Sequence, residues 1–308
     1  MRALVISGGA SKGAFAGGIV EHLLNERGKD YDLLLGTSTG ALIVPFVAIR
    51  KIAKLKKTFT TIRQKDIFNV SPFIIRKHRG MYISKMNHLG MIRQFMTGKK
   101  SFGERKNLRK LIDRTLTYQD FEDIKQSGKE VLVTVSNLTT RRVQYKSILD
   151  YDYQDFMDWM WASCNIVPFM SLVKKDGQEY ADGSFGEYIP IQHAINKGAT
   201  KIDVIILNPK DLDINSLPSR SPFDVLTKTF DFMLGQIEKD DIAIGNLEGL
   251  NKKVRIKFYY TPKVLTDNAF IFRPERMAKW WHEGLEFARN NDPGRFTLEP
   301  EDYNKDEA

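Results

Sequence analysis

Five residues, Gly36-Thr37-Ser38-Thr39-Gly40, place strict limits on the local fold of this chain. They follow the apolar run Leu33-Leu34-Leu35 and precede a second apolar run from Ala41 to Val44. This order predicts a strand, a sharp turn and the start of a helix. A nucleophile elbow has this arrangement, because small flanking residues let the backbone turn tightly and the helix N-terminus favours developing negative charge. The motif predicts Ser38 as a nucleophile, and a glycine-rich turn capped by this serine is the alternative.

A second glycine-rich turn lies near the N-terminus. The segment Ser7 to Gly13 separates a strand-like run, Ala3–Ile6, from a helical pattern that extends to about Arg27. Acyl transfer to a serine needs backbone N–H donors where the tetrahedral oxyanion forms, and glycines leave such donors uncovered. We therefore expect this turn to supply an oxyanion hole.

Phosphate-binding loops are the competing interpretation of the same turn. A Walker loop needs Lys and then Ser or Thr after its last glycine, whereas Gly13 is followed by Ala14 and Lys12 precedes it. A dinucleotide-binding G-x-G-x-x-G that begins at Gly8 needs glycine at the position of Ala10. The first interpretation fails and the second lacks a required glycine.

A candidate base lies 144 residues after Ser38, in the segment Tyr180-Ala181-Asp182-Gly183-Ser184. This segment falls between a strand expected around Ser171–Val173 and a helix expected over Ile191–Asn196. The pKa of an aspartate is normally near 3.9, so Asp182 needs partial desolvation to take a proton from serine directly. An ordinary Asp-Gly β-turn is the alternative for this segment.

These motifs together resemble those of the patatin-like phospholipases, which are acyl hydrolases with a Ser-Asp dyad. The family's glycine-rich loop corresponds to Gly8-Gly9-Ala10-Ser11-Lys12-Gly13, its G-T-S-x-G-A elbow to Gly36–Ala41, and its Asp-Gly pair to Asp182-Gly183. The segments Ala162–Pro168 and Asn137–Thr140 also resemble the family. The resemblance extends from Met1 to about Leu207, with two departures: Ala10 replaces a glycine, and Ser184 stands where Gly or Ala is usual.

The resemblance implies a mechanism without a metal or an organic cofactor. Ser38 attacks the ester carbonyl of a phospholipid or lysophospholipid, and Asp182 takes the serine proton and later activates water. The implied oxyanion and substrate-binding residues are Gly8, Gly9, Ala10, Lys12, Gly13 and Thr39, and the glycines that support the elbow and the turn are Gly36, Gly40 and Gly183. The oligomeric state is not predicted.

The sequence leaves three alternatives open: a different catalytic triad, a different reaction and a function without catalysis. A Ser-His-Asp triad with His193 or His282 follows the chain order of α/β-hydrolases, but only about one strand and one helix precede Ser38 here. An acyltransferase would use the same dyad with an alcohol or thiol acceptor in place of water. A membrane-binding scaffold would not need Ser38 at all.

The pattern of the whole chain predicts an α/β fold with a central, mostly parallel sheet covered by helices on both faces. The strand-like runs alternate with helical patterns and lie at Ala3–Ile6, Leu33–Leu35, Val131–Val135, Val143–Ile148, Ile202–Leu207 and Val254–Tyr260. We expect one domain over 1–290, with the motifs in 1–207, a loop at 208–220 and a C-terminal part over 221–290 that holds helices over Pro222–Ile237 and Pro274–Asn290. An acidic, frayed tail is expected over 291–308.

Charge is distributed unevenly. The segment from Arg50 to Arg114 has 19 Lys or Arg and three acidic residues, a balance of +16, so the rest of the chain has −7 of the total +9. Apolar side chains lie between these bases, for example Phe68, Phe73 and Phe95. The mixture fits peripheral contact with an anionic membrane. The alternatives are a solvated basic face and nucleic-acid binding, which is not expected because no recognised module is present.

Localisation is predicted from three features. Met1-Arg2 leads directly into the first strand, so no secretory signal is expected, and the single cysteine, Cys164, is expected to be a buried thiol. The longest apolar run, Ala41–Ile49, has nine residues, which is far too short for a bilayer span. We expect a cytoplasmic protein without a transmembrane segment, with peripheral contact at the membrane surface.

Overall fold

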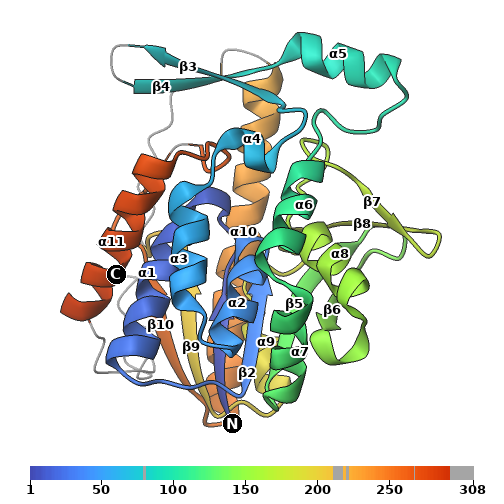
Figure 1. Cartoon of the computed structure of the whole chain (residues 1–308). Helices are drawn as coiled ribbons and strands as arrows, with labels where there is room; N and C mark the ends of the chain where they lie inside the picture. Colours follow the sequence, from blue (N-terminus) through green and yellow to red (C-terminus); the bar gives the residue numbers. More distant parts are fainter. Residues whose placement is uncertain (79–80, 211–217, 220–221, 267, 292–308) are drawn as a thin grey trace.

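An eight-stranded sheet forms the centre of the computed structural model, which describes residues 1–78, 81–210, 218–219, 222–266 and 268–291 (Figure 1). Its main strand order is β10-β9-β1-β2-β5-β8-β7, and β6 also pairs with β5. The strands β10, β9, β1, β2 and β5 are parallel, whereas β6 and β8 are antiparallel to β5. The strands are β1 (Arg2–Ile6), β2 (Leu33–Thr37), β5 (Glu130–Asn137), β6 (Arg142–Ser147), β7 (Val173–Lys175), β8 (Gln178–Asp182), β9 (Lys201–Ile206) and β10 (Arg255–Tyr260).

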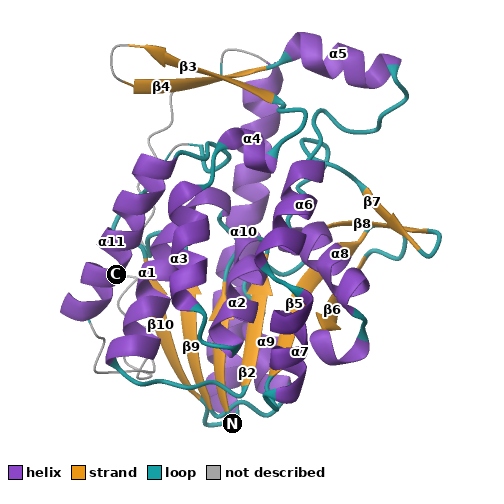
Figure 2. Ribbon diagram, in the orientation of Figure 1, coloured by secondary structure: helices purple, strands orange, loops and turns teal. Residues whose placement is uncertain are grey.

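Helices cover both faces of this sheet (Figure 2). In Figure 1 the helices α1, α2, α3, α6, α7, α8 and α11 lie in front of the sheet and α9 and α10 behind it. The helices are α1 (Gly13–Glu21), α2 (Thr39–Ala48), α3 (Ile52–Thr61), α4 (Gln64–Ile67), α5 (His88–Met96), α6 (Lys106–Thr115), α7 (Tyr118–Gln126), α8 (Tyr153–Ser163), α9 (Ile191–Asn196), α10 (Pro222–Asn251) and α11 (Pro274–Asn290).

The core has two layers because successive residues of a strand point to opposite faces. On β1, Leu4 and Ile6 pack in the layer under the front helices, while Ala3 and Val5 pack in the layer under α9 and α10. All four side chains are fully buried. This arrangement confirms the predicted α/β fold with helices on both faces.

The C-terminal helix α11 packs closely against α1 through glycines. A Cβ atom at Gly18 would lie 2.0 Å from the backbone oxygen of Trp281, and one at Gly284 would lie 2.1 Å from that of Phe15. Both positions therefore exclude any side chain. This contact joins the last described helix to the helix that follows the glycine-rich turn, and so supports the base of the site.

Most predicted elements are present, with three differences, the first of which is that the strand expected around Ser171–Val173 begins only at Val173, as β7. All six strand-like runs form strands, and the helices over Ile191–Asn196 and Pro274–Asn290 have the predicted bounds. Helix α10 continues to Asn251, beyond the predicted end at Ile237, because its second half keeps one buried side toward the sheet. The hairpin of β3 (Phe73–His78) and β4 (Met81–Met86) was not predicted, because bases interrupt its apolar pattern.

The hairpin and α5 lie beyond the carboxyl ends of the parallel strands (Figure 1). Within the described ranges, no helix is both long enough and apolar enough to cross a bilayer. Much of the loop predicted at 208–220 and nearly all of the tail predicted at 291–308 fall outside the described residues.

Candidate active site

Ser38 occupies the sharp turn between β2 and α2. Its backbone has φ 55° and ψ −119°, a conformation that residues other than glycine rarely adopt. A Cβ atom at Gly36 would lie 2.3 Å from the backbone carbon of Gly40, and one at Gly40 would lie 2.2 Å from the carbonyl oxygen of Ile6. The turn can be this tight only with glycine at both positions, and it has the geometry of a nucleophile elbow.

The segment that follows α8 holds the backbone of Ser38 in place. The Ser38 N–H donates to Oγ of Ser163 at 3.0 Å, and its carbonyl oxygen accepts from Sγ of Cys164 at 3.1 Å. Cys164 is buried, as predicted, and Ser38 itself is only 6% exposed. These bonds fix the strained turn from outside, as expected where an unfavourable backbone conformation is maintained by its surroundings.

Asp182 is the last residue of β8 and is fully buried. Its Oδ1 atom accepts from the N–H of Ser184 at 3.0 Å and from the Ser184 hydroxyl at 2.6 Å. Its Oδ2 atom has no hydrogen-bond partner among the described residues. The carboxylate is therefore fixed by one oxygen and keeps the other available for a proton.

Burial raises the pKa of Asp182 to about 6, against the hydrogen bonds from Ser184, the nearby Ser38 hydroxyl and the charge of Arg105, which lower it. The Ser38 hydroxyl is thus close to the carboxylate although it does not hydrogen-bond to Oδ2, which is common in catalytic pairs without substrate. Sequence reasoning treated Ser184 only as a departure from the family pattern. A serine two residues after an aspartate in a turn is the signal for the bonds that it makes.

The glycine-rich turn approaches this pair. A Cβ atom at Gly8 would lie 3.4 Å from the Ser38 Cβ and 2.9 Å from the Ser184 Oγ, so the Gly8 backbone lies directly beside the site. Gly9 has φ 155°, and Ala10 has φ 48° although alanine disfavours such values. The alanine therefore adopts the conformation that a glycine would have here.

Two further glycines let the turns pack directly against neighbouring elements. A Cβ atom at Gly13 would lie 2.3 Å from Oγ1 of Thr39, and one at Gly183 would lie 2.4 Å from the carbonyl oxygen of Thr134. Gly13 thus brings the N-terminal turn against the start of α2, and Gly183 brings the aspartate turn against β5. The structure gathers the glycine-rich turn, Ser38, Thr39 and Asp182 in one place.

The family model for patatin-like phospholipases matches residues 4–195, more than half of the chain. The chain belongs to the patatin-like phospholipase family. The matched region contains both glycine-rich turns and the aspartate turn, and it ends within α9.

Among solved structures, the crystal structure of VipD from Legionella pneumophila is similar to this patatin-like phospholipase. The TM-score is 0.50 and the sequence identity 14%, over 94% of this chain and 66% of that chain. At this identity the similarity shows the fold alone, and the chain spans slightly less than two thirds of the length of that VipD chain. No curated protein matches the sequence.

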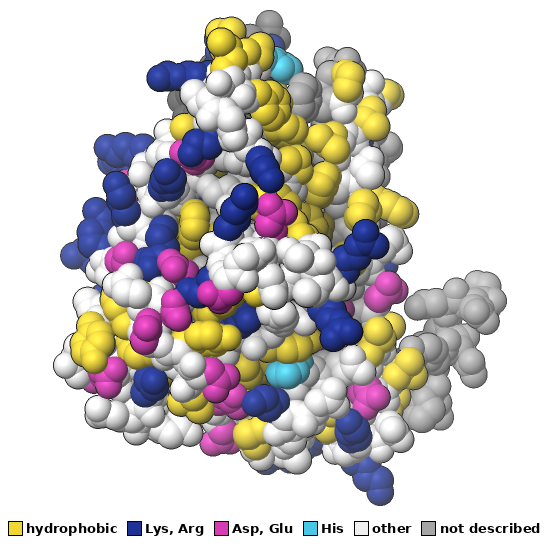
Figure 3. Space-filling model, turned by 90° about the vertical axis from the view of Figure 1, so that its right-hand side faces the viewer, with side chains coloured by type: hydrophobic (Ala, Val, Ile, Leu, Met, Phe, Trp, Pro, Cys, Tyr) yellow, Lys and Arg dark blue, Asp and Glu magenta, His cyan; other side chains and the backbone are white. Residues whose placement is uncertain are grey.

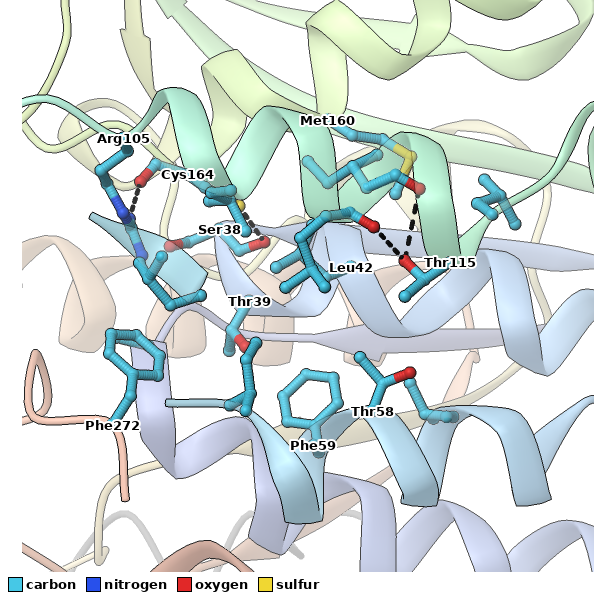
Figure 4. A pocket seen from close by; sticks show the side chains of 18 of the residues that line it. Ser38, Thr39, Leu42, Thr58, Phe59, Arg105, Thr115, Met160, Cys164 and Phe272 are labelled. Atoms are coloured by element: carbon cyan, nitrogen blue, oxygen red, sulfur yellow. Dashed lines mark hydrogen bonds between the residues drawn. The ribbon is translucent and has the colours of Figure 1, made fainter. Parts of the chain in front are cut away.

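An apolar channel runs from Ser38 into the layer of front helices of this patatin-like phospholipase (Figure 4). Of the described residues that line it, only Arg105 is charged. The walls come mainly from α2, α3, α6 and α8, with one residue each from α4 and α11, and they include Leu42, Leu55, Phe59, Leu108, Leu111 and Met160. Sequence reasoning missed the channel, because these side chains are far apart in the chain.

Lys12 projects from the glycine-rich turn toward the segment after β9. Its Nζ donates to Oδ1 of Asn208 at 2.6 Å. Desolvation lowers the pKa of Lys12 to about 8, while the charges of Glu238 and Asp231 raise it. Its role in substrate binding stays a prediction, and its side chain is bonded to Asn208 and lies in the field of two acidic residues of α10.

His193, the alternative base, lies in α9 and stacks on the Tyr145 ring with the ring centres 3.5 Å apart. Burial and the charge of Lys197 lower the pKa of His193 to about 4, so its ring is neutral near pH 7. Within the described ranges, no group of three His, Cys, Asp or Glu side chains is arranged to hold a metal ion.

Proposed function

We propose that this protein is a lipid esterase that hydrolyses phospholipids or lysophospholipids through an acyl-enzyme on Ser38, with Asp182 as the base. The observation that supports this most directly is the buried Asp182 carboxylate, which keeps one free oxygen next to the Ser38 hydroxyl. A pKa of about 6 suits a base at neutral pH, because it is ionised and still binds a proton more strongly than an ordinary aspartate.

The proposed reaction has two halves. The Ser38 oxygen attacks the ester carbonyl carbon while Asp182 takes its proton, and the N–H groups around Gly8, Gly9 and Ala10 stabilise the tetrahedral oxyanion. Protonated Asp182 then gives its proton to the leaving alcohol. In the second half Asp182 takes a proton from water, which attacks the acyl-enzyme, and it returns this proton to the Ser38 oxygen as the fatty acid is released.

The apolar channel is the proposed site of the acyl chain. It begins at Ser38 and its walls are almost entirely hydrocarbon, so an acyl chain attached to the reacting carbonyl can continue directly into it. Transfer of each CH₂ group from water into such a site contributes about 0.8 kcal/mol. This favours long-chain lipid esters over short-chain esters as substrates.

Fatty-acid release from a long-chain lysophospholipid tests this proposal. Ser38→Ala and Asp182→Asn should each lower kcat by roughly 10³-fold or more. Ser127→Ala, at an exposed serine that follows α7, and His193→Ala should keep activity close to that of the wild type. Loss of activity in the histidine variant would indicate a triad. Ester cleavage that needs an added alcohol or thiol would indicate an acyltransferase.

Part of the basic segment supports a further proposal, peripheral contact with an anionic membrane. The bases of α3 are largely neutralised: Lys54 pairs with Asp120 at 2.6 Å and Lys56 with Glu21 at 3.0 Å. On the hairpin and α5, the bases Arg76, Lys85 and Arg93 are exposed. We place the membrane contact on this second part.

Exposed apolar side chains accompany those bases on α5. Leu89 is 82% exposed, Phe95 51% and Met96 83%. Figure 3 shows hydrophobic side chains gathered at the upper end of the molecule, with Lys and Arg side chains nearby. Apolar side chains with cations around them suit insertion into the boundary of an anionic bilayer.

A further inference from the structure

Arg105 is a buried cation on the wall of the channel that begins at Ser38. It caps the N-terminus of α6 and is 4% exposed. Its Nη1 atom donates to the carbonyl oxygen of Cys164 and to Sδ of Met170. Its Nε atom has no hydrogen-bond partner in the described part of the chain, although it is buried. The guanidinium group therefore has an N–H donor that the described residues do not use.

The surroundings of this guanidinium are unusual for a buried charge. Its central carbon lies 5.1 Å from the centre of the Phe68 ring and 5.8 Å from that of Phe272. The described residues include no ion pair to it; Asp182 is the carboxylate whose charge acts on it, from a longer distance. Buried charges in proteins are normally paired, because their removal from water is costly. Among the described residues, Arg105 has no carboxylate in direct contact, and Asp182 acts on it only through its charge.

The proposed reaction makes this imbalance larger. When Asp182 takes the proton of Ser38, its carboxylate becomes neutral and no longer balances Arg105. A neutral donor such as glutamine would hold the Cys164 carbonyl without the desolvation cost of a cation. A cation at this position is therefore best explained by an anion that arrives with the substrate.

Arg105 is close enough to Ser38 to meet such an anion. Cys164 links the two, since its carbonyl accepts from Arg105 and its Sγ atom donates to the Ser38 carbonyl (Figure 4). In a glycerophospholipid, the phosphate is separated from the reacting ester only by the short glycerol backbone. A planar guanidinium matches two phosphate oxygens with parallel N–H donors.

We propose that Arg105 forms a phosphate subsite beside Ser38, which binds the phosphodiester of the lipid substrate. The inference rests on the proposed hydrolysis at Ser38. It makes this enzyme selective for phospholipid or lysophospholipid esters over neutral esters of glycerol. Phe68 and Phe272 hold the plane of the guanidinium, and the channel holds the acyl chain.

Two substrates with the same acyl chain test the subsite: a lysophospholipid and a monoacylglycerol, which lacks the phosphate. Arg105→Gln should lower kcat/KM for the lysophospholipid about 10- to 100-fold more than for the monoacylglycerol, as expected for the loss of a hydrogen bond to a charged group. Arg105→Lys should keep part of the preference for the lysophospholipid, because lysine keeps the positive charge but lacks the two parallel N–H donors of a guanidinium. Lys106→Gln, at the exposed neighbouring cation, should leave the ratio unchanged.

Binding of inorganic phosphate gives a readout that does not depend on turnover. Phosphate should raise the Tm of the wild type and inhibit monoacylglycerol hydrolysis, and both effects should be lost in Arg105→Gln. An equal fall on both esters, without an effect on phosphate binding, would mean that Arg105 is structural. Phosphate binding with an unchanged substrate ratio would mean a free-phosphate site, and would overturn the assignment to the lipid. If the wild type cleaves neither ester, the proposed hydrolysis fails, while phosphate binding still tests the subsite.

Discussion

Two cations, Lys12 of the glycine-rich turn and Arg105 at the start of α6, differ in what surrounds them. Lys12 donates to Asn208 and lies in the field of Glu238 and Asp231, so the protein itself balances its charge. Arg105 contacts a carbonyl oxygen, a sulfur atom and two aromatic rings. A cation that is balanced internally stabilises the fold, whereas one that is not is available to a ligand. This difference assigns Lys12 mainly to structure and Arg105 to substrate recognition.

The dependence of activity on pH should separate the two cations most strongly. Asp182 must be ionised to act as a base, so kcat/KM on a water-soluble ester should fall about tenfold per pH unit below its pKa of about 6. The charge of Arg105 lowers this pKa, so Arg105→Gln should move the acid limb to higher pH. Lys12→Met should not move it. An acid limb near pH 4 in the wild type would contradict the proposed environment of Asp182.

The sequence predicted the Ser38–Asp182 pair but not its neighbours, for physical reasons. A tight turn needs local glycines, so Gly36 and Gly40 identify the elbow from a few adjacent residues, and buried parallel strands have continuous apolar runs. The channel combines side chains of six helices with Ala10 and Phe272, so its walls come from nearly the whole length of the chain. No local pattern marks such an assembly, and Arg105 looks like any other base in a basic segment.

Charge distribution shows the same limit. The net charge of +16 over Arg50–Arg114 is counted from the sequence alone. This count does not distinguish bases that pair with an acidic side chain in the folded chain from bases that do not. Lys51 and Lys54 pair with Asp120 from a later helix, and only the folded chain brings them together. The hairpin was also missed, because bases interrupt the apolar pattern of its two strands.

The free energy of unfolding should depend more on Lys12 than on Arg105. Lys12→Met leaves Asn208 and buried Glu238 without their cation, so the free energy of unfolding should fall by about 1–3 kcal/mol. The ratio of lysophospholipid to monoacylglycerol hydrolysis should stay unchanged. Urea unfolding measures the first effect, and Lys57→Met, at an exposed lysine of α3, is the matched control with a change within about 0.5 kcal/mol. If Lys12→Met alters the ratio as much as Arg105→Gln does, the distinction between the two cations is wrong.

Membrane binding tests the same distinction, between neutralised and available cations, at the protein surface. The expected effect is smaller there. Lys85→Gln and Arg93→Gln should each weaken binding to anionic vesicles about fivefold, since a base near the surface contributes about 1 kcal/mol. Lys54→Gln should change binding little, because Asp120 already neutralises Lys54. Vesicle sedimentation at low and high salt measures this. Binding that does not respond to salt, or equal losses in all three variants, would contradict a contact through the hairpin and α5.

Covalent labelling of the nucleophile tests the central claim most directly. A fluorophosphonate with a long alkyl chain is attacked by an activated serine, and mass spectrometry of the digested protein locates the adduct. The account predicts one adduct, on the peptide that contains Ser38, which is absent in Ser38→Ala and forms much more slowly in Asp182→Asn. An adduct on another residue, or labelling that persists in Ser38→Ala, would contradict it.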